Sequence, residues 1–233
     1  MTRPAGGMGE RRQLPLDLGH DPAFGLGDFL VADSNQAAVA WLDRWPRWPA
    51  PALVLVGPPG SGKTHLACLW QARSGARRIA GCDLTPSRVP DLLGDAQAIV
   101  VDDARQAGEQ ALLHLYNMIA ERRGHALLTA TAAPARWPIA LADLRSRLVA
   151  APLIELAPPD DALLGAVLVK LFADRQIAVG QEVVAFLATR LERSFEAARR
   201  VVAAIDQAAL AAGRPVTVPL AREVLLATEA EHA

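Results

Sequence analysis

The fold of this 233-residue chain is decided by residues 57–64, which read Gly57-Pro58-Pro59-Gly60-Ser61-Gly62-Lys63-Thr64. Glycines in this spacing let main-chain N–H groups converge on phosphate oxygens at the start of a helix, whose dipole favours anions. In the GxxxxGK[ST] pattern, Lys63 reaches the β- and γ-phosphates and Thr64 places its hydroxyl on Mg²⁺. The segment therefore predicts a site for a nucleoside di- or triphosphate with magnesium.

The sequence on either side of this loop fits a phosphate site. Residues 52–56 are wholly apolar, as expected of a strand covered on both faces, and residues 63–73 continue as a helix. A later apolar run, residues 98–101, ends in Asp102 and Asp103. Acids at the end of a buried strand can hold Mg²⁺ and polarise an attacking water. We assign Asp102 mainly to the metal and Asp103 mainly to water activation; the alternative is a polar loop that opens with two solvated acids.

Strand and helix patterns alternate through the first two thirds of the chain. Further strand patterns occur at residues 77–80, 126–131 and 153–156, and further helical patterns at 34–45 and 109–123. This alternation predicts an α/β fold with a parallel sheet and helices on both faces. After Pro158-Pro159 only helical patterns remain. We therefore expect a tail at 1–18, a nucleotide-binding α/β domain at 19–157 and a small all-helical domain at 158–233.

Composition limits the partners and the location of the protein. The 24 Lys and Arg residues nearly equal the 25 Asp and Glu residues, so no overall basic field is present to hold a nucleic-acid backbone. Cys68 and Cys82 lack CxxC spacing and are expected to be reduced. No uncharged run approaches the ~20 residues of a membrane span, and the N-terminus lacks the apolar region of a signal peptide. We expect a cytoplasmic protein that does not bind membranes.

Taken with their spacing, these residues resemble the AAA+ ATPase module of the DnaA/Hda family of replication proteins, and most of all its shorter Hda branch, which regulates the initiator DnaA. The resemblance runs from Gln13 to about Leu226. Its motifs are Ser34-Asn35-Gln36, GPPGSGKTHLA at 57–67, VVDD at 100–103, LLTAT at 127–131 and DLRSRL at 143–148. The resemblance implies a P-loop AAA+ module, with its parallel sheet sandwiched by helices and followed by a helical lid, and ATP or ADP with Mg²⁺ as cofactors.

The resemblance also implies roles for residues outside residues 57–64. His65 would adjoin the nucleotide, and the segment from Phe29 to Asn35 would line the adenine pocket. For Phe29, a place in the hydrophobic core is the alternative interpretation. Thr131 falls at the sensor-1 position, where a polar side chain contacts the γ-phosphate. The family usually carries Asp there, so an ordinary strand-end threonine is the alternative interpretation.

Arg147 matches the arginine-finger segment of the family. A finger neutralises charge on the transferred phosphate, an effect of roughly 10³–10⁵ in rate. In an Hda-like protein it would act on ATP held by DnaA; the alternative is that Arg145 and Arg147 are a solvated pair. One departure concerns the sensor-2 arginine of the lid, whose position is taken by Glu196, with arginines nearby at 193, 199 and 200.

Residues 13–18 form a separate apolar motif, with leucines alternating at Leu14, Leu16 and Leu18 after Gln13. Pro15 removes a main-chain donor, so a central strand is disfavoured and an edge strand remains open. The hexapeptide also resembles the peptide by which replication proteins dock on the DNA polymerase sliding clamp, the β subunit of polymerase III. The resemblance therefore implies the clamp as a partner, in addition to DnaA.

The leading interpretation is an Hda-type regulator that binds adenine nucleotide and the clamp and promotes hydrolysis of DnaA-bound ATP. Only seven residues follow Leu226, so we expect no helix-turn-helix domain and no sequence-specific DNA binding. The alternatives are a DnaC/IstB-like helicase loader or transposition ATPase, a non-catalytic adaptor in which nucleotide supports folding, and a small nucleotide kinase. Formation of a homo-oligomer stays open.

Overall fold

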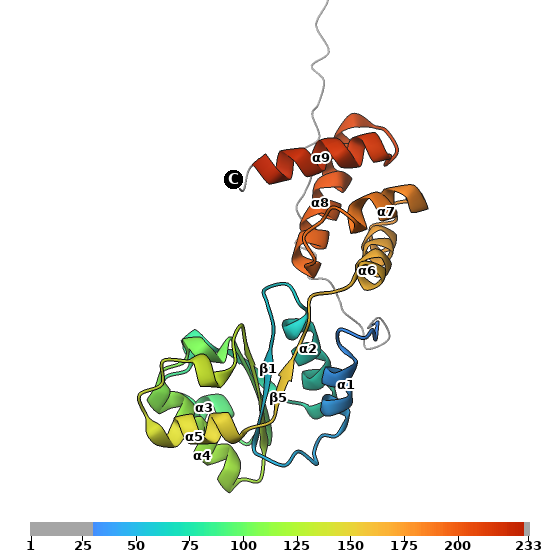
Figure 1. Ribbon diagram of the computed structural model, residues 1–233. Coiled ribbons are helices and arrows are strands. Elements are labelled where there is room, and N and C mark those ends of the chain that lie inside the picture. The colour runs from blue at the N-terminus through green and yellow to red at the C-terminus, as the bar shows by residue number, and fades with distance from the viewer. Residues whose placement is uncertain (1–29, 231–233) are drawn as a thin grey trace, which may run out of the picture.

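Residues 30–230 are described in a computed structural model, in which helices α6–α9 stand above an α/β domain (Figure 1). Five residues with predicted roles lie outside the described residues, so the clamp-like peptide and part of the adenine pocket stay predictions; these residues are Gln13, Leu14, Leu16, Leu18 and Phe29.

The centre of the α/β domain is a five-stranded parallel sheet with the order β2-β3-β4-β1-β5. Every residue of β1 is buried, because the strand is covered on both faces and flanked on both edges. The carboxyl ends of parallel strands meet at one edge of the sheet, and the predicted α/β fold is thereby confirmed. The strands are β1 Ala52–Val56, β2 Arg77–Ala80, β3 Ala98–Asp102, β4 His125–Ala130 and β5 Leu153–Glu155.

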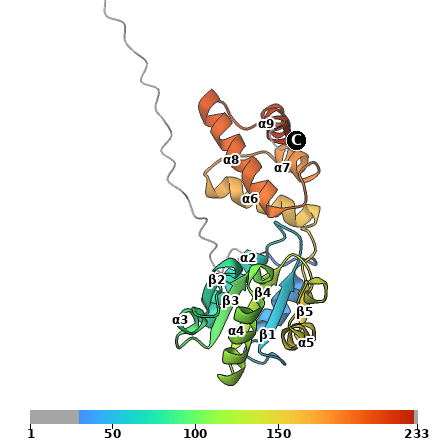
Figure 2. The same cartoon turned by 90° about the vertical axis from the view of Figure 1, so that its left-hand side faces the viewer.

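Helices cover both faces of the sheet, as Figures 1 and 2 show. The alternating side chains of β1 divide the core: Leu53 and Leu55 pack with α1 and α2, whereas Val54 packs with α3, α4 and α5. The helices are α1 Gln36–Asp43, α2 Lys63–Ser74, α3 Val89–Leu93, α4 Glu109–Glu121 and α5 Ala142–Ala150. Short 3₁₀ helices η2 Gly81–Asp83, η3 Ala104–Gln106 and η4 Pro134–Arg136 follow strands β2, β3 and β4.

Two differences from the sequence patterns matter for the site. Strand β4 covers residues 125–130 rather than 126–131, so Thr131 lies just after the strand. Helix α5 was not predicted as a helix, because its polar residues obscure the helical pattern and only Leu144 and Leu148 turn towards the core.

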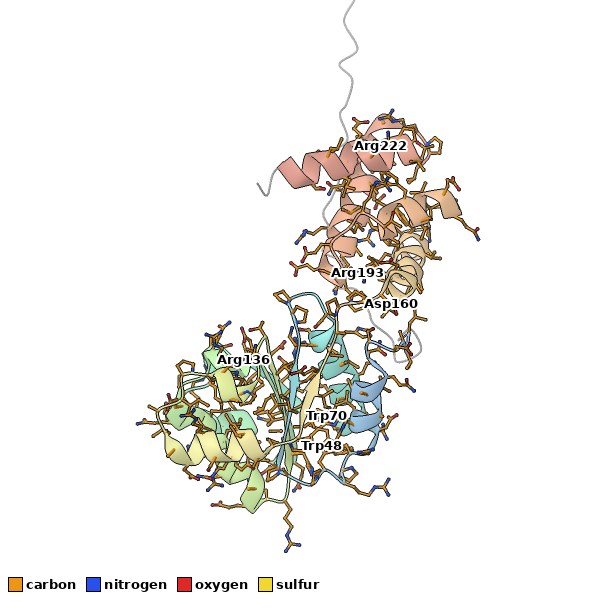
Figure 3. All side chains as sticks on the ribbon, viewed as in Figure 1. Trp48, Trp70, Arg136, Asp160, Arg193 and Arg222 are labelled. Carbon is orange, nitrogen blue, oxygen red and sulfur yellow. The ribbon has the colours of Figure 1, made fainter. Side chains whose placement is uncertain are left out.

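A cluster of tryptophans holds the far end of α2 against the sheet. The ring of Trp70 stacks on that of Trp48, with centroids 5.1 Å apart, and meets Trp45 edge-on at 6.1 Å. Figure 3 shows Trp48 and Trp70 side by side within the α/β domain. Because each buried aromatic ring removes about 150–250 Å² from water, this contact fixes the carboxyl-terminal half of α2.

Helices α6 Asp161–Asp174, α7 Gln181–Ala188, α8 Phe195–Ala212 and α9 Val218–Ala230 surround a hydrophobic core of their own. Phe172 and Leu187 are fully buried in this core. The N-cap of α6 is Asp160, whose Oδ1 accepts the N–H of Leu163 at 2.7 Å. We call this part the lid. Between residues 30 and 230, no helix combines the length and the hydropathy that a membrane crossing requires.

Candidate nucleotide-binding site

The chain passes from β1 to α2 through a turn that requires glycine. Gly60 and Gly62 have φ values of +71° and +96°, a region that L side chains rarely adopt. A Cβ at Gly57 would lie 2.7 Å from Ser61 Oγ and 2.8 Å from the carbonyl oxygen of Leu156. Backbone conformation and space therefore both exclude side chains, and the bare main chain is left at the amino end of α2, as phosphate binding requires.

Ser61 gives a second indication of a ligand at this turn. The residue is only 5% exposed, and its hydroxyl has no hydrogen-bond partner among the described residues. A buried polar group without a partner costs free energy, so native proteins rarely leave one. The residues of the turn therefore fit a bound phosphate group.

The ammonium group of Lys63 lies across the turn. Its Nζ donates to the carbonyl oxygens of Gly57 and Pro58, both at 2.8 Å. Burial lowers the pKa of Lys63, while the charges of Asp102 and Asp103 oppose this shift. A cation is thus held beside residues 57–64, which we call the phosphate loop. Thr64, which follows in the first turn of α2, is exposed.

Asp102 closes β3, and Asp103 follows in the left-handed region with a φ of +50°. Both acids are linked through Thr129 of the neighbouring strand β4. The Thr129 hydroxyl donates to Asp102 Oδ1 at 2.6 Å and accepts the main-chain N–H of Asp103 at 2.9 Å. The carboxylate of Asp103 accepts a hydrogen bond from Gln106 Nε2. Thr129 therefore fixes the orientation of the Asp102 carboxylate.

Thr129 was missed by the sequence reasoning, which selected Thr131. Thr129 is 1% exposed and reaches both acids, whereas Thr131 is exposed beyond the end of β4. The available signal was a hydroxyl inside an otherwise apolar strand. The hydroxyl can be linked to the two acids only when β3 and β4 are known to be neighbours, and the sequence alone does not give this pairing.

Arg78 on β2 is a second residue that the sequence reasoning missed. Its guanidinium forms an ion pair with Asp102 Oδ2 and donates to Cys68 Sγ on α2 at 3.2 Å. Burial acts to lower the pKa of Arg78, but the hydrogen bond and the charge of Asp102 raise it above its usual value. An arginine inside a four-residue strand gives no sequence signal for this contact.

Asn35 lies before α1 and is 7% exposed. Its Oδ1 accepts the N–H of Ala32 at 2.9 Å, and its Nδ2 donates to the carbonyl oxygen of Leu30 at 2.9 Å. These bonds shape the segment that leads into α1, and an adenine-binding role for Asn35 stays a prediction. His65 is half-buried in α2, next to the loop residues.

Arg147 lies on α5, which packs on the sheet face opposite to that of α2. Its Nε donates to Asp143 Oδ1 at 2.7 Å, and its guanidinium lies 5.4 Å from the centre of the Tyr116 ring. About a third of its side chain is exposed. The structure therefore does not bring Arg147 together with the phosphate loop of its own chain; Arg145 beside it is exposed.

The lid contacts the phosphate loop through the start of α8. Phe195 donates its main-chain N–H to the carbonyl oxygen of Gly60 at 2.9 Å, and its ring lies against Gly62. Ser194, the N-cap of α8, accepts the N–H groups of Glu196 and Ala197. The loop is thus covered by the amino end of a lid helix.

The arginines near the expected sensor-2 position contact other residues of the lid. Arg193 pairs with Asp161 at 3.0 Å, and Figure 3 shows Arg193 and Asp160 where the lid meets the α/β domain. Arg200 lies 3.5 Å from Glu196 on its own helix. In place of an arginine, the lid presents Ser194 and Phe195 to the loop.

The arrangement provides donors for phosphate oxygens at residues 60–64 and a cation at Lys63. Oxygen ligands suitable for Mg²⁺ are available at Thr64 and Asp102. The fit is carried by the bare glycine turn and by the buried hydroxyl of Ser61.

Replacing Thr129 with Val tests its bridging role. Valine keeps the shape but removes the hydroxyl, which leaves the Asp103 N–H without its acceptor and Asp102 without a donor. We expect the free energy of unfolding to fall by about 1–3 kcal/mol, measured by urea denaturation.

Two further variants control this measurement. Thr129→Ser keeps the hydroxyl and should recover most of the loss, and Thr131→Val should change stability by less than about 0.5 kcal/mol because Thr131 is exposed. Equal effects of Thr129→Val and Thr131→Val would contradict the bridging role.

Comparison with known proteins adds independent support for the lid. Residues 161–225 match the family model described as "Hda, lid domain". Over 236 aligned residues, the chain is 27% identical to an uncharacterized protein of Haemophilus influenzae, and the match covers 92% of this chain and 98% of that protein.

Solved structures of DnaA share the fold. Domain III of the Thermotoga maritima replication initiation protein DnaA superposes with a TM-score of 0.73 at 18% identity, over 88% of this chain and 96% of that one. DnaA from Aquifex aeolicus bound to AMPPCP superposes with a TM-score of 0.65 at 17% identity, over 77% of this chain. This chain spans 64% of the length of that DnaA chain.

The low identities to the DnaA structures establish the fold alone, while the family model describes the lid. The resemblance to the Hda branch is therefore supported by the family model over residues 161–225, and the chain as a whole shares the fold of DnaA domain III.

Proposed function

We propose that this chain is an Hda-like regulator that binds ATP or ADP with Mg²⁺, docks on the sliding clamp and promotes hydrolysis of ATP held by DnaA, which prevents repeated initiation of chromosome replication. The observation that carries the proposal is a phosphate loop of the required backbone form in a chain whose lid matches that of Hda. The lid and the DnaA-like fold support a DnaA-related replication regulator.

Adenine nucleotide binding is supported by the turn at residues 57–64. Main-chain N–H groups would hold the phosphates, and Lys63 would leave the carbonyl oxygens of Gly57 and Pro58 for the terminal phosphate oxygens. Magnesium, when bound to Thr64 and Asp102, would neutralise phosphate charge. The AMPPCP in the Aquifex aeolicus DnaA structure supports the same kind of ligand here.

An action of Arg147 on a nucleotide of another protein is supported by its position. It lies on the opposite sheet face from α2 and is partly exposed, so it is available to a partner rather than to its own loop. Asp143 and the Tyr116 ring hold the guanidinium in one orientation, which lowers the entropic cost of presenting it. The charge would stabilise the transition state of hydrolysis on DnaA.

Clamp docking rests on residues 13–18, outside the described part of the chain. Burying each leucine contributes about 1.5–3 kcal/mol. After the cost of ordering the peptide, a dissociation constant near micromolar is expected. A helicase loader or transposition ATPase remains the alternative, and it gives no reason for such a peptide.

Nucleotide binding should depend on the Lys63 side chain. Lys63→Ala removes charge-assisted hydrogen bonds to phosphate, so we expect the dissociation constant for ADP, measured by calorimetry, to rise at least about tenfold. Lys170→Ala is the matched control, because Lys170 lies on α6 in the lid and pairs with Asp174. Unchanged binding by the Lys63 variant would remove the loop from the proposed site. Regulation that survives without nucleotide binding would favour the adaptor interpretation.

Stimulation of DnaA should depend on Arg147. We expect Arg147→Ala to lower the rate of ATP hydrolysis by DnaA, in the presence of clamp-loaded DNA, by at least about 100-fold relative to the unaltered protein. Arg145→Ala, from the same helix, should retain most of the stimulation. Loss with Arg145→Ala and not with Arg147→Ala would show that the finger was assigned to the wrong residue.

The clamp interaction should depend on the leucines of the N-terminal peptide. A chain with Leu16→Ala and Leu18→Ala loses most of the expected apolar contact, so its affinity for the purified clamp should fall at least about 30-fold in a surface-binding assay. Arg11→Ala, just outside the peptide, should bind as before. Binding to helicase or single-stranded DNA without any clamp affinity would favour the loader interpretation.

A further inference from the structure

Each oxygen of the Asp102 carboxylate already has a partner within the protein. Oδ1 accepts the hydroxyl of Thr129, and Oδ2 forms the ion pair with Arg78. The position of Arg78 follows from the sheet. In the register of β2 and β3, Ala80 lies opposite Asp102 and Arg78 lies opposite Val100, so Arg78 and Asp102 share one sheet face.

Arg78 is held more firmly than a surface arginine. Its side chain is 32% exposed and that of Asp102 is 23% exposed, whereas the surface pair of Arg73 and Asp43 is 47% and 62% exposed. The second arm of the guanidinium donates to Cys68 Sγ on α2 at 3.2 Å. Partial burial reduces screening by water, so this pair interacts more strongly than an exposed one.

Asp102 is also the carboxylate assigned to magnesium. An oxygen that is paired with the guanidinium of Arg78 is less able to bind a metal ion at the same time. We propose that Arg78 is an internal counter-ion of Asp102, which occupies this carboxylate in the metal-free protein and competes with Mg²⁺ for it. The inference rests on the proposed nucleotide function of the loop, and it makes Arg78 a positioning residue.

The competition has a measurable effect on the coupling between metal and nucleotide. Without metal, Arg78 neutralises the charge of Asp102, so this carboxylate repels the phosphates of a nucleotide less strongly. With metal, part of the free energy with which Mg²⁺ binds Asp102 is used to displace Arg78. The ratio of the ADP dissociation constants without and with Mg²⁺ is therefore small in the unaltered protein, and it increases when Arg78 is removed.

Calorimetry with ADP, in excess Mg²⁺ and in excess chelator, tests the inference on the full chain. We expect Arg78→Ala to raise the ratio of the two dissociation constants at least about tenfold, because an uncompensated charge then faces the phosphates. Arg73→Ala is the matched control, since it removes an arginine of an ion pair at the far end of α2. It should leave the ratio within about twofold. A ratio that Arg78→Ala leaves within twofold overturns the inference.

Further variants separate this role from a purely structural one. A structural contact alone would lower the stability of Arg78→Ala but leave the ratio unchanged. Arg78→Lys keeps the charge and should restore much of the original ratio. In a background with Asp102→Asn, the identity of residue 78 should no longer affect the ratio, because the shared carboxylate charge is gone. A persistent effect of Arg78→Ala in that background also overturns the inference.

A measurement without nucleotide distinguishes this inference from the proposed function. Mn²⁺ alone, followed by electron paramagnetic resonance, should bind Arg78→Ala at least about fivefold more tightly than the unaltered protein. If that increase occurs in a chain that binds no ADP, the proposed function fails and the competition stands. If ADP binds normally but Mn²⁺ affinity is the same in both proteins, the function stands and the competition is overturned.

Discussion

The parallel pairing of β1, β3 and β4 is the constraint on which the candidate site depends. It places the loop after Val56 and the acids after Val101 at one edge of the sheet. The main-chain N–H of Gly57 donates to the carbonyl oxygen of Ala130, which joins the start of the loop to the end of β4. Residues far apart in the sequence are thus held together by backbone hydrogen bonds, and side chains only refine their positions.

The contact between the lid and the phosphate loop extends this arrangement. The carbonyl oxygen of Gly60 is occupied by Phe195, and a Cβ at Gly60 would overlap Ser194. Gly60 is therefore constrained twice, by its backbone conformation and by the lid. Because these contacts are direct, a change in the conformation of the loop would displace the start of α8. The position of the lid is therefore coupled to the conformation of the loop.

Much of the fold was predictable, because the sequence contains strong local signals. The uniform apolar run of β1 indicates a strand, and the glycine spacing after it indicates a phosphate loop; the helical patterns after Pro158-Pro159 correspond to the helices of the lid. Helix α5 was not predicted, since a short helix with polar faces gives a weak periodic signal.

The contacts of Asp102 could not be predicted, because they are made by residues on two other strands. Thr129 and Arg78 reach Asp102 only when β4 and β2 flank β3, and strand order is a property of the whole sheet. One strand end is enough to identify the two carboxylates, but the side chains that hold Asp102 lie on other strands and give no signal there.

Helix α2 has the phosphate loop at one end and Trp70 at the other. The ring of Trp48, which stacks on that of Trp70, meets His125 edge-on at the base of β4, so the environment of these indoles depends on how α2 packs on the sheet. A displacement of the helix on ligand binding would alter the packing of these rings. The ultraviolet emission of these tryptophans is therefore expected to respond to events at the opposite end of the helix, without any attached label.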